Sequence, residues 1–391
     1  MTPNPLSLAL AERRLAGLPV IDLTASNPTE CGFTYDGDSI LAALANPASL
    51  AYEPDARGLL TAREVVSEYY SARGERVAPE NIILTTSTSE AYSYAFRLLC
   101  DPGDEILVPQ PSYPLFDFLA DLEDVRLVRY PLLYDHGWQI DFHALQEAIT
   151  GRTRGVIVVN PNNPTGNFCK VHEMAQLNEI CVAREMAIIA DEVFLDYALG
   201  ETAVRSFAGN AGGALTFTMS GISKICGLPQ MKASWLVTSG ADALRGAALE
   251  RLEVVADTYL SMNAPVQHAL PAFLRLRHAF QRELQERVRA NLAELDRQLE
   301  RQDRVGEGCT RLGIEGGWYA VVVLPANSSS DELAMRLLNE YGIYVHPGHY
   351  YEFASARALV VILITPSDVF ASGVDILITA ASKSSVAEKQ D

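Results

Sequence analysis

Apolar runs alternate with segments of helical pattern through the first two thirds of the chain. Val-, Ile- and Leu-rich runs predict strands at Asn81–Thr85, Ile106–Val108, Val125–Val128, Gly155–Val159 and Met186–Ala190. Helices are predicted at Ala91–Leu99 and in the segment that contains Leu59, Leu60, Val65 and Val66. Strands that alternate with helices are typical of an α/β fold whose mostly parallel sheet is covered by helices on both faces.

The last third of the chain has a different pattern. Between Phe280 and Glu300, Leu284, Val288, Leu292, Leu295 and Leu299 recur at helical spacing among charged residues. This amphipathic helix leads into a smaller region with strands at Tyr319–Leu324, Ile343–Val345 and Leu359–Ile364. We therefore predict an N-terminal arm at 1–46 with part of the small domain, a large domain at 47–280 and a small α+β domain at 281–391.

Composition excludes several classes of protein. A chain of 391 residues can bury a large core, and its net charge of −18 argues against nucleic acid or an anionic membrane as partner. The longest apolar run, Ala358–Ile364, is too short to span a bilayer. Six scattered cysteines form no C-x-x-C pair, so neither a metal site nor a redox pair is expected. With no signal-peptide pattern at the start, a cytoplasmic location is expected.

Three polar groups follow one another along the chain, and the first two come directly after predicted strands. They are the string Asn160–Gly166, the carboxylate of Asp191 and the amine of Lys224. Lys224 is the only charged residue between Met219 and Met231, and a lysine among uncharged neighbours has a lowered pKa, as a nucleophilic amine needs. Asp191 ends an apolar strand, where open α/β sheets bind ligands, although a loop or helix-capping aspartate would fit the same position.

A hydroxyl-rich segment precedes the helix predicted at Ala91. Ser87, Thr88 and Ser89 with the backbone N–H groups of a helix start could hold a phosphate, and a Ser or Thr there could equally be an ordinary N-cap. One helix start can do both.

Together these groups resemble the pattern of the class I and II aminotransferases, which are fold-type I pyridoxal-phosphate enzymes. The resemblance covers the chain from about Ile21 to Ile378. The resemblance implies the fold-type I transferase architecture. It also implies that Lys224 holds pyridoxal 5'-phosphate as a Schiff base, that Asp191 pairs with the pyridine nitrogen and that Asn163 donates to the ring oxygen. Ser87, Thr88, Ser89, Ser223 and Lys232 would serve the cofactor and its phosphate.

Two tyrosines extend the resemblance. Tyr113 aligns with the aromatic residue that stacks on the cofactor ring, and a core tyrosine is the alternative. Tyr52 resembles the tyrosine that reaches the phosphate in the neighbouring subunit, which implies a homodimer with shared active sites.

The chain departs from the family pattern at three positions. Phe194 stands where a tyrosine usually hydrogen-bonds the cofactor, and Lys232 replaces an arginine that binds phosphate by two parallel bonds. Val360 occupies the usual place of the arginine that binds the substrate carboxylate, and Arg357 is shifted from it by an odd number of residues. The aromatic segments 316–319 and 346–351 resemble substrate-facing segments, with core packing as the alternative for Trp318 and Tyr350.

The expected activity is transfer of an amino group from an amino acid or amine to a 2-oxo acid. A lyase or cyclase acting on an amino acid with the same cofactor is the alternative. The family's regulators that carry an added DNA-binding segment are a poor fit to this acidic chain. A nucleotide-binding α/β protein lacks support because neither G-x-G-x-x-G after a strand nor G-x-x-x-x-G-K-[ST] occurs. Donor, acceptor and carboxylate binding are not determined by these patterns.

Overall fold

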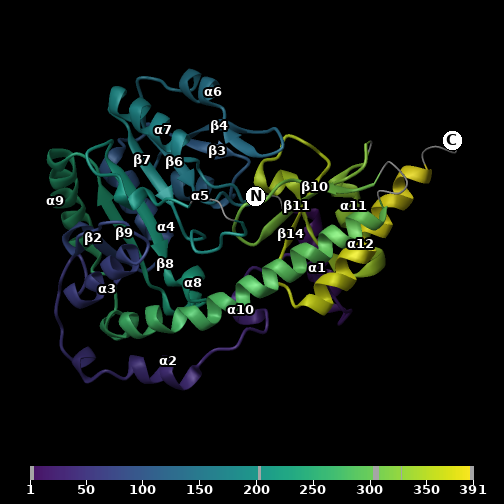
Figure 1. Cartoon of the computed structure of the whole chain (residues 1–391), viewed down its shortest axis with the longest axis horizontal. Helices are drawn as coiled ribbons and strands as arrows, with labels where there is room; N and C mark the ends of the chain where they lie inside the picture. Colours follow the sequence, from purple (N-terminus) through teal and green to yellow (C-terminus); the bar gives the residue numbers. More distant parts are fainter. Residues whose placement is uncertain (1–3, 201–203, 303–307, 327, 388–391) are drawn as a thin grey trace.

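The largest element of the fold is an eight-stranded sheet, seen in a computed structural model that describes residues 4–200, 204–302, 308–326 and 328–387 (Figure 1). In spatial order the strands are β2 (Ile82–Thr85), β9 (Ser234–Ser239), β8 (Thr216–Gly221), β7 (Ala187–Asp191), β6 (Thr153–Val159), β3 (Glu105–Gln110), β4 (Arg126–Tyr134) and β5 (Trp138–Ile140). Strands β9 and β5 run against the others. The prediction of a mostly parallel sheet is confirmed.

Helices cover both faces of this sheet, as strand β7 illustrates. All of β7 is buried, and successive side chains of a strand point to opposite faces. Ala187 and Ile189 pack with α4 (Thr88–Leu99), α5 (Leu115–Leu122) and α9 (Asp242–Tyr259). Ile188 and Ala190 pack with α6 (Phe142–Glu147) and α7 (Val171–Ala183). A strand buried on both faces reads as a continuous apolar run, which is why it was predictable.

A smaller antiparallel sheet lies beyond the large one. Its order is β10 (Thr310–Arg311), β11 (Tyr319–Val323), β14 (Ala358–Ile362) and β13 (His346–Pro347). The N-terminal segment joins this part of the molecule, because β1 (Ile21–Asp22) pairs in parallel with β12 (Ile343–Tyr344). Around the small sheet lie α1 (Pro5–Leu15), α11 (Ser330–Arg336) and α12 (Ser367–Ala387) (Figure 1).

One long helix, α10 (Ala264–Gln302), runs from the large sheet to the small one (Figure 1). Its first turns pack with α3 (Leu60–Ser71), and its last turns pack with the core around the small sheet. The helix predicted at Phe280–Glu300 is only its second half, so the domain boundary predicted at 280 falls inside a helix. The predicted boundaries at 46 and 280 stay predictions. Within the described residues, no helix is long and apolar enough to cross a membrane.

Candidate active site

A cavity of about 310 Å³ lies at the edge of the large sheet where the parallel strands end. Strands β2, β3, β6, β7 and β8 all finish at this edge, so the segments that follow them meet there. Nine of the ten predicted site residues line the cavity. They are Ser87, Thr88, Ser89, Tyr113, Asn163, Asp191, Ser223, Lys224 and Lys232.

Lys224 enters the cavity from α8 (Ile222–Ile225), a short helix directly after β8. Burial lowers the pKa of its amine to about 8, although the nearby carboxylate of Asp191 raises it in part. The Nζ atom lies 5.1 Å from the ring centre of Trp318 and 5.7 Å from that of Phe194. The hydroxyl of Tyr197 donates to the backbone oxygen of Lys224. The lysine is therefore held in place with about a tenth of its amine uncharged at pH 7, far more than a solvated lysine has.

Asp191 is the last residue of β7 and faces the same cavity. Burial raises the pKa of its carboxyl to about 6, and hydrogen bonds limit that rise. One comes from the backbone N–H of Val193 to Oδ1 at 3.2 Å, and the other comes from the hydroxyl of Tyr92 to Oδ2 at 3.1 Å. An ionised Asp191 can accept a proton-bearing ring nitrogen as a partner.

Glu192, the neighbour of Asp191, is held by hydrogen bonds inside the fold and does not face the cavity. It is buried on the other face of the chain and accepts hydrogen bonds from the hydroxyl of Ser206 at 2.5 Å and the backbone N–H of Phe207 at 2.7 Å. Of the two adjacent carboxylates, only Asp191 lines the cavity.

Asn163 follows β6 in a loop with internal hydrogen bonds. Asn162 donates through Nδ2 to Thr165 Oγ1 at 2.7 Å and to the backbone oxygen of Pro111 at 3.1 Å. Gly166 has φ of +71°, and a Cβ there would come within 2.6 Å of the backbone oxygen of Gly316, so glycine is required. Asn163 lines the cavity, where its side-chain amide can donate through Nδ2 to a bound group, while its buried Oδ1 has no partner among the described residues.

The hydroxyl-rich segment begins helix α4. Ser87 is its N-cap and accepts from the backbone N–H of Glu90 at 3.2 Å, while Glu90 Oε2 accepts from the N–H of Thr86 at 2.7 Å. The N-cap alternative is thus correct, and the helix start still faces the cavity with its partial positive charge. Lys232 lies on the same cavity wall in a left-handed conformation with φ of +53°.

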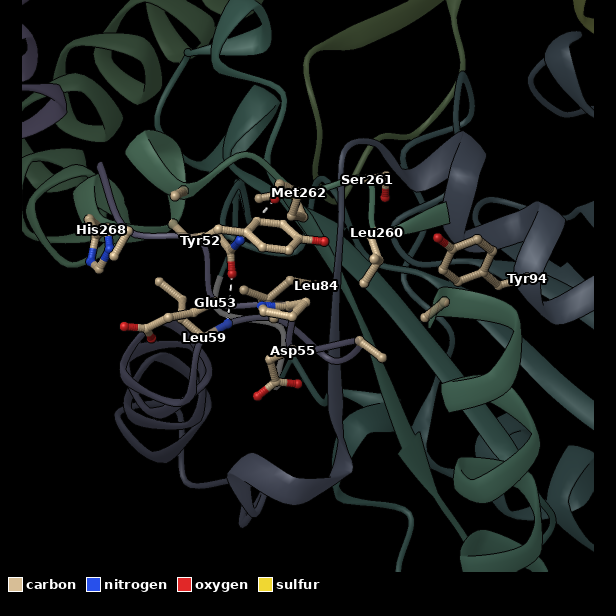
Figure 2. A pocket seen from close by; sticks show the side chains of 17 residues that line it. Tyr52, Glu53, Asp55, Leu59, Leu84, Tyr94, Leu260, Ser261, Met262 and His268 are labelled. Carbon is tan, nitrogen blue, oxygen red and sulfur yellow. Dashed lines mark hydrogen bonds between the residues drawn. The ribbon is translucent and has the colours of Figure 1, made fainter. Parts of the chain in front are cut away.

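The two predicted tyrosines have different positions. Tyr113 is 41% exposed at the cavity and meets Phe116 edge-on, with ring centres 6.4 Å apart. Tyr52 lies outside this cavity, is 79% exposed and lines a second, smaller pocket of about 80 Å³ together with Met262 and His268 (Figure 2). The structure of one chain leaves the role of Tyr52 toward a neighbouring subunit a prediction.

The structure also shows where the residues that depart from the family pattern lie, beginning with Phe194 and Val360. Phe194 lines the cavity, so its ring lies there without a hydroxyl. Val360 is fully buried in β14, and Arg357 is exposed with Nη1 3.5 Å from the backbone oxygen of Leu324. Neither Val360 nor Arg357 lines the cavity.

Several cavity or supporting residues were missed by sequence reasoning, and three of them show why. Tyr92 lies one helical turn after Ser89, and that spacing on a predicted helix could have found it. Ser26 and Phe116 also line the cavity. Ser26 comes from the N-terminal segment, whose path depends on long-range pairing that no local pattern reveals.

Residues 20–366 match the family model described as aminotransferase class I and II. The chain belongs to this family. Structural similarity agrees with this assignment. An aminotransferase from Escherichia coli superposes with a TM-score of 0.84 at 25% identity, covering 97% of this chain and 95% of that one. The alanine aminotransferase from Pyrococcus furiosus has the same fold, with a TM-score of 0.86 at 22% identity, covering 97% and 96%.

Curated relatives of this aminotransferase-family chain match over a shorter span. The glutamate-pyruvate aminotransferase AlaA of Escherichia coli K12 is 32% identical over 259 residues, which is 66% of this chain and 64% of the relative. An alanine aminotransferase of Mycobacterium bovis is 30% identical over 275 residues, 69% of this chain and 64% of the relative. The matched region thus spans slightly less than two thirds of each relative.

Proposed function

We propose that this chain is a pyridoxal-phosphate-dependent aminotransferase that moves an amino group from an amino acid or amine to a 2-oxo acid. The supporting observation is the meeting of Lys224, Asp191 and Asn163 in one cavity at the strand ends. An amine of lowered pKa, a buried carboxylate and an amide that can donate through Nδ2 suit the aldehyde, ring nitrogen and ring oxygen of this cofactor. When bound, pyridoxal phosphate delocalises negative charge from the donor's reacting carbon into its ring.

The residues of the chain would divide the remaining work. Ser87, Thr88, Ser89, Ser223 and Lys232 would bind the phosphate end, because they combine a helix N-terminus, hydroxyls and a positive charge. The uncharged Nζ of Lys224 would take a proton from the donor and return it at another atom. Asp191, when ionised, would keep the ring nitrogen protonated, and Tyr113 would cover the ring at the cavity mouth.

The test of this proposal uses the purified protein incubated with pyridoxal phosphate. We expect an absorbance band in the visible region that borohydride abolishes, and peptide mass mapping should then place the reduced cofactor on Nζ of Lys224. Addition of an amino donor should convert the band, with release of one keto acid per site. A protein that gains no adduct at Lys224 would contradict the proposal.

A second candidate function is a lyase or cyclase with the same cofactor. Two departures support it: Phe194 lines the cavity without a hydroxyl, and the buried Val360 provides no guanidinium for the donor. The two functions separate by product. Transfer needs a 2-oxo acid acceptor for turnover, whereas elimination releases ammonia without one.

We also propose a homodimer with shared sites and a cytoplasmic setting. The exposed Tyr52 and the family's use of that position support the dimer. Among the described residues all six cysteines are free, as is usual where thiols stay reduced.

A further inference from the structure

Tyr319 lines the part of the cavity that lies toward Val360, the position where family members carry the carboxylate-binding arginine. This part of the cavity is called the corner below. Tyr319 begins β11 and pairs with Ile362 of β14, while Val321 pairs with Val360. Alternation along each strand puts the side chains of Tyr319, Val321 and Val360 on the same face of the small sheet. Val360 is therefore the diagonal neighbour of Tyr319, at about 7–8 Å between such positions. Tyr319, which lines the cavity, thus lies on the same sheet face as Val360, where family members carry a guanidinium.

The N-terminal segment brings a second hydroxyl to this corner. The backbone oxygen of Leu23 accepts from the N–H of Ile362 at 2.8 Å, and the N–H of Leu23 donates to the oxygen of Tyr344 at 3.0 Å. The segment is thereby tied to the strand end that pairs with Tyr319. Ser26 follows three residues later and lines the cavity with Tyr319 and Asn163. Burial raises the pKa of Tyr319, and side-chain hydrogen bonds with Asn163 and Ser26 limit that rise, which indicates that the three polar groups are close together.

The groups at this corner carry no charge near neutral pH. Burial raises the pKa of Tyr319 to about 12, so its hydroxyl keeps the proton and can donate it in a hydrogen bond. His346 pairs with Val360 across the strands, but burial lowers the pKa of its imidazole to about 4 and Nδ1 lies 3.1 Å from the hydroxyl of Tyr351. Among the described residues that line the cavity, the positive side chains are Lys224 and Lys232.

We propose that Ser26 and Tyr319 form the subsite for the carboxyl group of the amino donor, and that they bind its oxygens by uncharged hydrogen bonds. The inference rests on the proposed aminotransferase function and names the donor class. Hydroxyl donors recognise a carbonyl oxygen whether the group is an acid, an amide or an ester, whereas a guanidinium selects the charged acid. The donors are therefore primary amines with a carbonyl group on the reacting carbon, and the charge of that group matters little.

The test compares L-alanine with L-alaninamide as donors to the protein loaded with pyridoxal phosphate. Single-turnover conversion of the cofactor band gives a rate constant divided by an apparent dissociation constant for each donor. We expect the two values to lie within about tenfold of each other, as uncharged hydrogen bonds allow. Tyr319→Phe should lower both values by about tenfold. The matched control is Tyr351→Phe. The ring centre of Tyr351 lies 6.4 Å from that of Tyr319, but Tyr351 does not line the cavity, so this substitution should change each of the two values by much less than tenfold.

A second readout needs no turnover. Propionate and propionamide lack an amine and therefore cannot react. Their binding to the protein that carries pyridoxal phosphate can be followed by the shift in wavelength of the cofactor's absorbance band. Tyr319→Phe should weaken binding of both by similar factors, while the thermal midpoint of unfolding shows that the variant is folded.

Two outcomes separate the subsite from the proposed function. Suppose that alanine is preferred over alaninamide by about a thousandfold and that Tyr319→Phe leaves this preference unchanged. A positively charged group would then bind the carboxylate, which would overturn the proposed subsite but not the proposed aminotransferase function. Failure of borohydride to fix the cofactor on Lys224 would instead overturn the proposed function.

Discussion

Lys224 determines when the chain can react with an aldehyde, because only its uncharged amine is a nucleophile. Burial lowers the pKa of Lys224 to about 8, and Asp191 opposes this effect. We therefore expect the rate of adduct formation between the cofactor-free protein and pyridoxal phosphate to rise with pH, with a midpoint near pH 8. Asp191→Asn should move the midpoint to lower pH. Stopped-flow absorbance across pH measures both.

Lys232→Met provides the control for that experiment, because Lys232 has no part in the lowered pKa of Lys224. Its midpoint should match that of the unaltered protein even if phosphate binding weakens. A midpoint at about 10.4, the value of a solvated lysine, would contradict the buried environment.

Tyr92 is expected to set the acid side of the pH profile. Burial raises the pKa of Asp191 to about 6, and the hydrogen bond that the Tyr92 hydroxyl donates to Oδ2 keeps it from rising further. Tyr92→Phe should raise the pKa of Asp191 further, so the acid limb of a plot of the cofactor half-reaction rate against pH should move to higher pH. Tyr94→Phe is the matched control on the same helix, since Tyr94 stacks on Tyr259 with ring centres 5.9 Å apart. An acid limb that is the same in both variants would remove Tyr92 from this role.

At the level of elements, a buried amide ties α10 to the segment that follows β14 of the small sheet. Asn291 donates through Nδ2 to the backbone oxygens of Leu363 at 2.8 Å and Thr365 at 2.7 Å, just beyond β14. Asn291→Leu would leave both buried oxygens without a donor, which should lower the free energy of unfolding by about 3 kcal/mol. Urea denaturation followed by circular dichroism measures the loss.

Arg289→Leu is the control for this helix. Arg289 is exposed two residues earlier, so its replacement should change the free energy of unfolding by less than about 0.5 kcal/mol. Equal effects in the two variants would mean that the oxygens of Leu363 and Thr365 find other donors.

Whether a strand or helix could be predicted from the sequence depended on how apolar its residues are. Strand β7 was predicted because its residues before Asp191 are all apolar, whereas β8 and β9 were missed although every residue in them is buried. Their Ser and Thr residues hide the apolar pattern. The first half of α10 was missed as well, because it contains Pro271, which normally ends a helix.

The candidate site was predictable for a topological reason. Parallel strands end at one edge, so residues that follow predicted strands, such as Asn163 and Asp191, could be expected to meet. Ser26 could not, because its place depends on pairing between Ile21 and Ile343, which are far apart in the chain. Local patterns carry no record of such a contact.

At the scale of the whole molecule, the proposed homodimer concerns Tyr52, which lines the second pocket (Figure 2) and not the cavity of its own chain. A homodimer would have about twice the chain mass of 42.7 kDa, and light scattering coupled to gel filtration measures this directly. The dimer alone does not show that the sites are shared. Sharing requires that Tyr52 of one subunit act in the cavity that contains Lys224 of the other.

Mixed dimers test that sharing. Lys224→Ala removes the covalent attachment, and Tyr52→Ala should weaken cofactor binding, so each homodimer lacks complete sites. If Tyr52 acts across the interface, a dimer with one subunit of each kind has one complete site, made of Lys224 from one subunit and Tyr52 from the other. Equal mixing with subunit exchange should then recover about a quarter of the unaltered activity at limiting cofactor. If Tyr52 acts within its own subunit, the mixture should give no more than the mean of the two separate variants.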